Sequence, residues 1–271
     1  MTLLVSWVGV DSRGPASIYI ASDSRITWDT KTKFDFGRKI FGFKNYPDII
    51  GYCGDVLFPS IIIGQIIDVA DRGLLYKNET NSEQRFHTVR ELVETSFKNY
   101  PSEITGVTND VIKILFASRE GRFGFRCYLL KWHKGGQWQY EKTDLPDHSD
   151  VLFSLGSGSL EFNERYKVYS GNKSLNQGTS RSVFHCFCDT LRNMKDPLCG
   201  GAPQLTGLYR KDNAQYFGVV YQNSPYLLGV KVNHLTNAGN IEWRNELFER
   251  FDPKDMVLMP NAQRQPNPLI H

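Results

Sequence analysis

The chain opens on short stretches rich in aliphatic and aromatic residues, which are separated by turn residues. Residues 2–10 and 17–21 form two such stretches, and the polar cluster at residues 11–15 is typical of a hairpin turn between them. Residues 38–44 and 48–53 repeat the pattern. This opening region therefore predicts a set of antiparallel strands.

Helical spacing of apolar residues appears later, in separate blocks. Residues 55–75 carry apolar side chains on most faces, and an amphipathic stripe follows around residues 89–97. A third helix is predicted over residues 180–194, where Thr179 or Ser180 offers a side-chain oxygen as the N-cap. The helices thus do not alternate with single strands.

Further strand-like runs lie between and after these helices. They cover residues 111–117, 124–131, 151–155, 203–210, 215–222 and 225–232. Because this order disfavours a doubly wound parallel sheet, we expect antiparallel sheets whose outer faces are covered by helices. We expect one domain over residues 1–271, with a C-terminal extension from about residue 235 that ends in an extended tail over residues 260–271.

Composition and charge narrow the class of protein. Hydrophobic residues make up 40% of the 271 residues and aromatic residues 13%, which is enough to build a sizeable core. The formal net charge of +3 is small, and no run of Lys and Arg stands out. Nucleic acid is therefore not an expected partner.

Cysteine usage and the longest apolar run bear on the cellular compartment. The five cysteines are scattered and odd in number, which fits reduced thiols better than a disulfide framework. The apolar run at residues 61–67 is far shorter than the roughly 20 residues that cross a bilayer. The first ten residues also lack the basic and apolar regions of a secretion signal. We therefore expect a cytoplasmic protein without a membrane partner.

Thr2 is the candidate nucleophile because it directly follows Met1. A small second residue permits removal of the initiator methionine, which we expect here. Thr2 would then carry both a hydroxyl nucleophile and a free α-amine, whose ordinary pKa of about 7.7–8.0 lets it act as a base near neutrality. A threonine at this position is common, so the rest of the chain has to support the assignment.

Four separate motifs accompany this threonine. They are Ala-Ser-Asp-Ser-Arg around Asp23, Gly-Arg-Lys-Ile around Lys39, Gly-Ser-Gly around Ser157, and Asp-Pro-Leu-Cys-Gly-Gly from Asp196. With these motifs the chain resembles the catalytic β-type subunits of the proteasome superfamily, which are N-terminal nucleophile hydrolases. The likeness is closest in style to the bacterial Anbu and HslV-like peptidases, and it covers roughly residues 2–232.

The resemblance implies a role for each residue of the first two motifs. Asp23 and Lys39 lie 16 residues apart, which is the spacing of an aspartate and a lysine in the family. Thr2 would be the nucleophile, and the ammonium of Lys39 would favour its developing alkoxide. Asp23 would orient Lys39. Arg25 matches an arginine that is usually structural.

The two later motifs would support the amino terminus. Ser157 would hydrogen-bond near the terminal amine, and Asp196 and Cys199 would hold the serine and the amine in place. The family has serine where Cys199 stands. Because a thiol is the weaker donor and acceptor, we expect this difference to tune the activity.

The same likeness points to an oxyanion hole and a substrate pocket. Gly54, before the first long helix, would offer a backbone N–H to the scissile carbonyl oxygen, and Cys53 is the alternative. The residues that would line the substrate pocket are Ile26, Gly37, and Gly51 or Tyr52.

The resemblance as a whole implies a fold and an activity. The fold would be α+β, a four-layer αββα sandwich of two antiparallel sheets flanked by helices. The activity would be hydrolysis of peptide or unfolded protein substrates through an acyl-enzyme on Thr2, inside self-assembled rings that an ATPase unfoldase can feed. No cofactor or metal is expected, because no metal-ligand spacing and no phosphate-binding glycine loop occurs. Two alternatives stay open: an inactive structural subunit of the same fold, and an amidase of the wider superfamily that acts on small amides.

Overall fold

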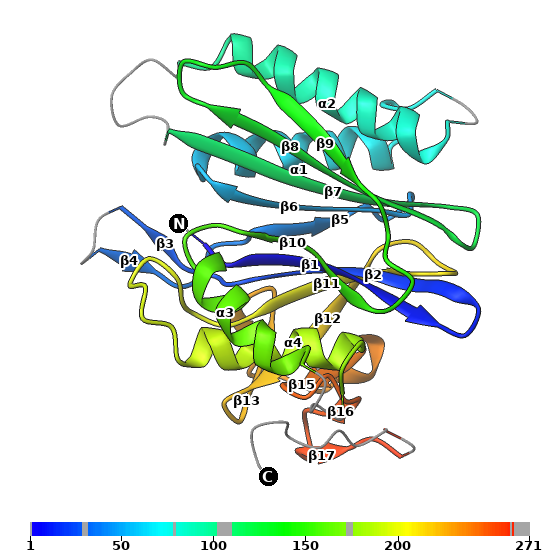
Figure 1. The fold of residues 1–271 in the computed structure, drawn as a ribbon, viewed down its shortest axis with the longest axis vertical. Helices are drawn as coiled ribbons and strands as arrows, with labels where there is room; N and C mark the ends of the chain where they lie inside the picture. Colours follow the sequence, from blue (N-terminus) through cyan, green and yellow to red (C-terminus); the bar gives the residue numbers. More distant parts are fainter. Residues whose placement is uncertain are drawn as a thin grey trace.

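The computed structural model places the chain in an arrangement dominated by β-strands (Figure 1). The residues that it describes are 2–28, 32–77, 80–101, 110–171, 176–260 and 262. Within them, 17 strands form four sheets, and four α-helices and one short 3-10 helix accompany these sheets.

The largest sheet has eight strands and contains the predicted opening hairpin. Its strands are β1 (Leu4–Asp11), β2 (Gly14–Ser22), β10 (Asp150–Leu155), β11 (Gln204–Tyr209), β12 (Gln215–Tyr221), β13 (Ser224–Leu227), β14 (Val230–Lys231) and β15 (Trp243–Asn245). β1 and β2 pair antiparallel, with Leu4 opposite Ser22, so the predicted hairpin is confirmed. β10 extends the sheet beyond β1, and β11 extends it beyond β2.

The second sheet has five strands that are neighbours in chain order. They are β5 (Ile40–Gly42), β6 (Asp48–Gly54), β7 (Val111–Glu120), β8 (Gly124–His133) and β9 (Gln139–Thr143). Two small sheets complete the set. They pair β3 (Ile26–Thr27) with β4 (Lys33–Phe34), and β16 (Phe251–Asp252) with β17 (Val257–Leu258).

The helices lie in pairs against the two large sheets (Figure 1). The pairs are α1 (Leu57–Asp71) with α2 (Ser82–Lys98) on the five-stranded sheet, and α3 (Ser159–Tyr169) with α4 (Ser180–Arg192) on the eight-stranded sheet. Thr179 is the N-cap of α4, because its side chain accepts a hydrogen bond from the backbone N–H of Ser182 at 3.2 Å. The cap expected from the sequence is therefore confirmed.

The core consists of three apolar layers. One lies between the two large sheets, and each of the other two lies between one large sheet and its pair of helices. Successive side chains of β1 point to opposite faces of the sheet, so this strand contributes to two of the layers. Val5 and Trp7 pack toward α4, whereas Leu4 packs toward the five-stranded sheet. In that middle layer Leu4 joins Ile20 of β2 and Ile49 of β6. The described chain starts between the two large sheets (Figure 1), so Thr2 lies at the end of this middle layer.

The expected α+β fold, a four-layer αββα sandwich of two antiparallel sheets flanked by helices, is wrong. Among the described residues the fold is mostly β, with 37% strand, 24% helix and several antiparallel sheets. The physical reason lies in segments whose apolar pattern is too short or too polar to mark a strand in the sequence. β15 to β17 are two or three residues long, and β9 is mostly exposed.

Several other elements differ from the sequence-based expectation. The strand expected over residues 225–232 is split into β13 and β14, because Leu228 and Gly229 adopt positive φ values of 52° and 83°. Neither α3 nor β9 was expected. Most of the expected tail over residues 260–271 lies outside the described residues. In the described part of the chain, the helices are too short or too polar for any of them to cross a bilayer.

Candidate active site

Three polar side chains meet where the start of β1, the end of β2 and the start of β5 come together. They belong to Thr2, Asp23 and Lys39. Lys39 Nζ lies 2.9 Å from Thr2 Oγ1 and 2.7 Å from Asp23 Oδ1. The side chains of Lys39 and Asp23 are fully buried, and Thr2 is 1% exposed. The structure thus brings together the three residues that the sequence assigns to the nucleophile and its ion pair.

The carboxylate of Asp23 is fixed by the backbone around it. Besides Lys39, its Oδ1 accepts a hydrogen bond from the N–H of Leu3 at 3.1 Å. Its Oδ2 accepts hydrogen bonds from the N–H groups of Gly200 at 3.0 Å and Arg25 at 3.3 Å. A buried ion pair is stable only when its remaining lone pairs are satisfied, and these charge-assisted bonds do that. They also fix the direction from which the Lys39 ammonium reaches the threonine hydroxyl.

The geometry divides the chemical roles around Thr2. An ammonium has only donors, so Lys39 stabilises negative charge on Oγ1 but cannot accept the hydroxyl proton while it donates to that oxygen. A separate base is needed. The nitrogen of Thr2 is an amide as long as Met1 is attached, and it becomes a basic amine only when Met1 is removed. Met1 itself lies outside the described residues.

Ser157, Cys199 and Asp196 form a connected set of side chains. Ser157 Oγ lies 3.4 Å from Cys199 Sγ, and the thiol of Cys199 donates to Asp196 Oδ2 at 3.5 Å. Burial alone raises the pKa of the Asp196 carboxyl, but hydrogen bonds from Ser157, Leu198 and Cys199 outweigh burial and leave this pKa below its ordinary value. Burial raises the pKa of the Cys199 thiol to about 12, so it stays a neutral donor.

The backbone of the Gly-Ser-Gly loop packs directly against Thr2. The N–H of Gly158 donates to the carbonyl oxygen of Thr2 at 3.2 Å. Gly156 has a φ of +88°, and a Cβ at this position would lie 2.0 Å from the same oxygen. Glycine at position 156 is therefore required both by the backbone conformation and by the close approach to Thr2. Ser157 thus lies between two glycines that contact Thr2, and its expected hydrogen bond near the terminal amine stays a prediction.

Arg25 links the segment after β2 to the Asp-Pro-Leu-Cys-Gly-Gly loop. Its guanidinium makes a bidentate pair with Asp35, at 2.7 and 2.9 Å, and donates to the carbonyl oxygens of Pro197 and Cys199 at 3.3 and 3.1 Å. The structural role expected for Arg25 is therefore confirmed. Its acidic partner Asp35, ten residues further along the chain, was missed in the sequence.

Gly54 and Cys53 end β6, three residues before α1 begins. Gly54 has a φ of +96°, and a Cβ there would lie 2.1 Å from the carbonyl oxygen of Val111 on β7. The neighbouring Asp55 accepts a hydrogen bond from the N–H of Phe58 and so caps the first turn of α1. Its carboxylate already offsets the positive end of the helix dipole, which the sequence reasoning missed. The oxyanion role of Gly54, with Cys53 as the alternative, stays a prediction.

The expected pocket residues separate into two groups. Ile26 and Gly37 are neighbours, because a Cβ on Gly37 would lie 2.4 Å from Ile26 Cδ1, and Gly37 lies two residues before Lys39. Gly51 faces the middle layer, next to Leu4. The side chain of Tyr52 points the other way, into the core beneath α1. Tyr52 would therefore line a pocket only with its backbone, and the pocket role of these residues stays a prediction.

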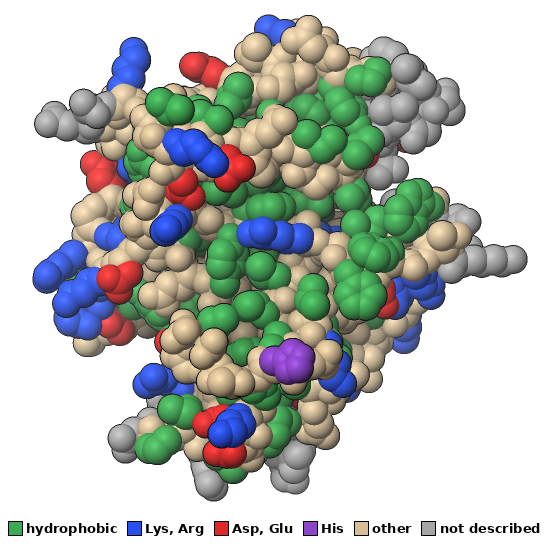
Figure 2. Space-filling model, turned by 180° about the vertical axis from the view of Figure 1, so that it is seen from behind, with side chains coloured by type: hydrophobic (Ala, Val, Ile, Leu, Met, Phe, Trp, Pro, Cys, Tyr) green, Lys and Arg blue, Asp and Glu red, His purple; other side chains and the backbone are tan. Residues whose placement is uncertain are grey.

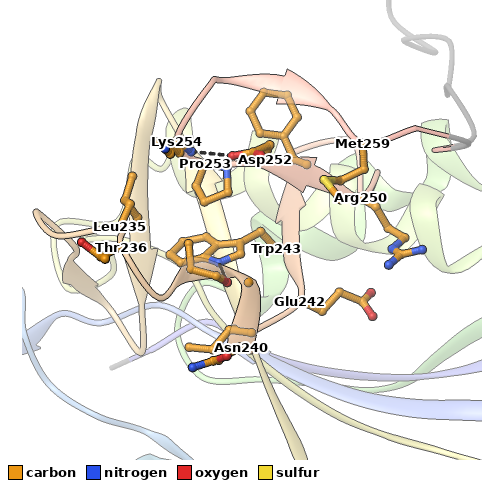
Figure 3. Close-up of a pocket in the computed structure, with 14 residues that line it drawn as sticks. Leu235, Thr236, Asn240, Glu242, Trp243, Arg250, Asp252, Pro253, Lys254 and Met259 are labelled. Carbon is orange, nitrogen blue, oxygen red and sulfur yellow. Dashed lines mark hydrogen bonds between the residues drawn. The ribbon is translucent and has the colours of Figure 1, made fainter.

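Two cavities lie close to or beyond this cluster. One of about 510 Å³ adjoins residues 199–202 and is also lined by Arg25, Asp35 and Phe36. The other, of about 370 Å³, lies in the C-terminal extension, where Figure 3 shows Trp243 between Pro253 and Asn240. The second cavity shares no lining residue with the Lys39 cluster, so it is not part of the candidate active site.

Comparison with other proteins identifies no family for this chain. No protein-family model matches the chain, and no curated protein matches it. In the described part of the chain, no group of three or more His, Cys, Asp or Glu side chains is placed to hold a metal ion. The contacts of Thr2, Asp23 and Lys39 are therefore the basis for a functional proposal.

Proposed function

We propose that this chain is an N-terminal threonine peptidase that hydrolyses peptide bonds through an acyl-enzyme on Thr2. The observation that carries the proposal is the contact of one buried ammonium, that of Lys39, with both the Thr2 hydroxyl and the Asp23 carboxylate. A fully buried lysine beside a hydroxyl at the second position has a clear chemical use, because it stabilises the alkoxide form of that hydroxyl.

The reaction follows from these positions once Met1 is removed. The free amine of Thr2 takes the hydroxyl proton while Oγ1 attacks the scissile carbonyl carbon. The tetrahedral intermediate then expels the amine of the leaving peptide, which receives that proton, and an ester on Thr2 remains. Water, deprotonated by the same α-amine, hydrolyses this ester and regenerates the hydroxyl. In each step the ammonium of Lys39 stabilises the charge on Oγ1.

One observation favours the alternative of an inactive structural subunit. Thr2 is 1% exposed, so a substrate carbonyl does not reach its hydroxyl in the chain that carries Met1. Under the peptidase proposal, removal of Met1 is the activating step, because it creates the free α-amine that acts as the base. The two alternatives therefore make opposite predictions for the processed chain.

We also propose that the peptidase assembles with copies of itself into rings, which an ATPase unfoldase can supply with unfolded protein. Hydrophobic side chains are exposed in several patches on the face shown in Figure 2. The exposed large apolar side chains include Trp28, Phe34 and Phe36 around the β3–β4 hairpin, and Leu57 and Ile61 on α1. Exposed apolar groups of this size support contact with another chain.

A cytoplasmic location belongs to the same proposal. All five cysteines are free and buried, which fits a compartment that keeps thiols reduced.

The test is hydrolysis of denatured protein and of mixed fluorogenic peptides by protein whose intact mass shows loss of Met1. The matched variants are Thr2→Ser, which keeps a hydroxyl, and Thr2→Ala, which lacks one. We expect turnover by the wild type and by Thr2→Ser, and none by Thr2→Ala. Equal turnover by Thr2→Ala would refute the proposal, and no turnover by any processed form would favour the inactive subunit.

A further inference from the structure

Gln204 makes three hydrogen bonds to the backbone that carries the candidate site. Its Oε1 accepts from the N–H of Lys39 at 3.2 Å. Its Nε2 donates to the carbonyl oxygen of Gly37 at 2.7 Å and to that of Asp23 at 3.1 Å. The side chain is fully buried at the start of β11, where Gln204 pairs with Ser22 of β2.

This contact pattern needs an amide. Two carbonyl oxygens require two donors, and one backbone N–H requires one acceptor, which the CONH2 group of glutamine supplies together. A carboxylate would point an oxygen at both carbonyl groups, and an aliphatic side chain would leave three buried backbone groups without this partner. The identity of the residue is therefore fixed by the two segments that it joins.

Those two segments carry the ion pair of the site. Gln204 holds the backbone of Asp23 on one side and that of Gly37 and Lys39 on the other. The carbonyl oxygen of Lys39 is held in turn by the N–H of Tyr52 at 3.1 Å. Because both the backbone N–H and the carbonyl oxygen of Lys39 are held, its ammonium has little freedom to move away from Thr2.

We propose that Gln204 is a positioning residue of the Thr2 site, which sets the distance between the Lys39 ammonium and the threonine hydroxyl. It acts through the backbone of Lys39 and Asp23 and does not touch Thr2. The inference rests on the proposed peptidase function for its kinetic consequence, whereas the clamp itself is a statement about the fold.

The kinetic test compares Gln204→Leu with a matched control on the same strand. Thr206→Val is the control, because Thr206 is also fully buried on β11 and its hydroxyl donates one hydrogen bond to the carbonyl oxygen of Gln215. Displacement of a catalytic group by about 1 Å can cost 100-fold in rate. We expect kcat of Gln204→Leu to fall roughly 10- to 100-fold with KM unchanged, and Thr206→Val to keep the wild-type kcat.

Gln204→Glu adds a signature that a loss of stability alone does not produce. The introduced carboxyl can donate to a carbonyl oxygen only in its neutral form, so part of the clamp returns when it is protonated. The ratio of its kcat to that of the wild type should therefore rise as the pH falls. A ratio that is constant with pH, or a kcat of Gln204→Leu equal to that of Thr206→Val, would overturn the positioning role.

Backbone amide exchange tests the clamp without any activity. Loss of the Gln204 acceptor should speed exchange of the Lys39 amide in Gln204→Leu, while Thr206→Val leaves this amide as protected as in the wild type. Faster exchange in Gln204→Leu, together with a processed wild type that has no activity, would support the clamp and refute the peptidase. Unchanged exchange at Lys39 would refute the clamp, whatever the activity.

Discussion

Lys39 Nζ lies 2.9 Å from Thr2 Oγ1, although 37 positions separate the two residues in the chain. The contact joins the two large sheets, because Thr2 lies two residues before β1 of one and Lys39 directly precedes β5 of the other. A cation is thus buried between two sheets, where desolvation opposes it. It is stable there because Asp23 compensates the charge at 2.7 Å.

Replacement of Lys39 by Met tests how strongly this pair is coupled. The variant keeps the length of the side chain but leaves the Asp23 carboxylate buried without its cation, so we expect a loss of about 3–5 kcal/mol in the free energy of unfolding. The double variant Asp23→Asn/Lys39→Met leaves no unpaired charge, and it should recover part of that loss. Denaturant unfolding of both single variants, the double variant and the wild type gives the comparison. Strictly additive effects of the single changes would show that the pair is not coupled.

The close approach of the Gly-Ser-Gly loop to Thr2 predicts an asymmetry between two glycines. Gly156→Ala places a Cβ 2.0 Å from the carbonyl oxygen of Thr2, whereas Gly14→Ala meets nothing within 4 Å, and both positions have positive φ. Gly14→Ala should cost only the backbone strain of roughly 1–2 kcal/mol. Gly156→Ala should cost more and should also abolish Thr2 reactivity. Thermal unfolding measures the difference, and equal losses in the two variants would contradict the packing described here.

The Arg25–Asp35 pair predicts part of the pH dependence of stability. The hydrogen bond from Arg25 holds the pKa of the Asp35 carboxyl below its ordinary value. A group with a depressed folded-state pKa contributes stability that is present above its unfolded pKa of about 3.9 and is lost as the pH falls through the lower folded value. Because the Asp35 side chain is 38% exposed, we expect this contribution to be below about 1 kcal/mol.

Arg25→Met should remove that contribution. The variant should lose less stability than the wild type as the pH is lowered from about 5 to about 2, since its Asp35 no longer has the cationic partner. Denaturant unfolding at several pH values compares the two slopes. If the slopes coincide while the wild type is the more stable protein at neutral pH, then Arg25 acts only through the carbonyl oxygens of Pro197 and Cys199.

The contacts of Cys199 predict different kcat values for variants with serine and with alanine at this position. Cys199→Ser keeps a donor to Asp196 and a partner for Ser157, so we expect at least the wild-type kcat. Cys199→Ala removes both contacts and should lower kcat by about tenfold, by analogy with the loss of one hydrogen bond to a charged group. Steady-state kinetics of the two variants decides. An active Cys199→Ala variant with unchanged kcat would mean that the thiol supports no step.

The sequence could predict those elements whose apolar side chains are long enough to show a period. α4 was expected because Val183, Phe184 and Phe187 lie on one face, and all three are buried. α3 was missed because only Phe162 and Tyr169 of its residues are buried, which leaves too little apolar periodicity. The overall class was misjudged for the same reason, because the short C-terminal strands have no readable pattern.

The candidate site divides in a similar way. Thr2, Asp23 and Lys39 were expected together only through a family resemblance, since no local rule of chain structure relates positions so far apart. The clamp by Gln204 depends on pairing between β2 and β11, which a single sequence does not reveal. The visible sign for this clamp was a polar Gln204 at the start of a strand that also contains Leu205 and Leu208.

The most direct test of the central claim is the mass and position of an adduct with a peptide epoxyketone. Processed wild-type protein, with Met1 removed, should gain the mass of one reagent molecule, and peptide mapping should place it on Thr2. Lys39→Met should react much more slowly, and Thr2→Ala should not react. A processed, folded wild type that gains no mass, or that is labelled at another residue at the same rate as Thr2→Ala, would contradict the account.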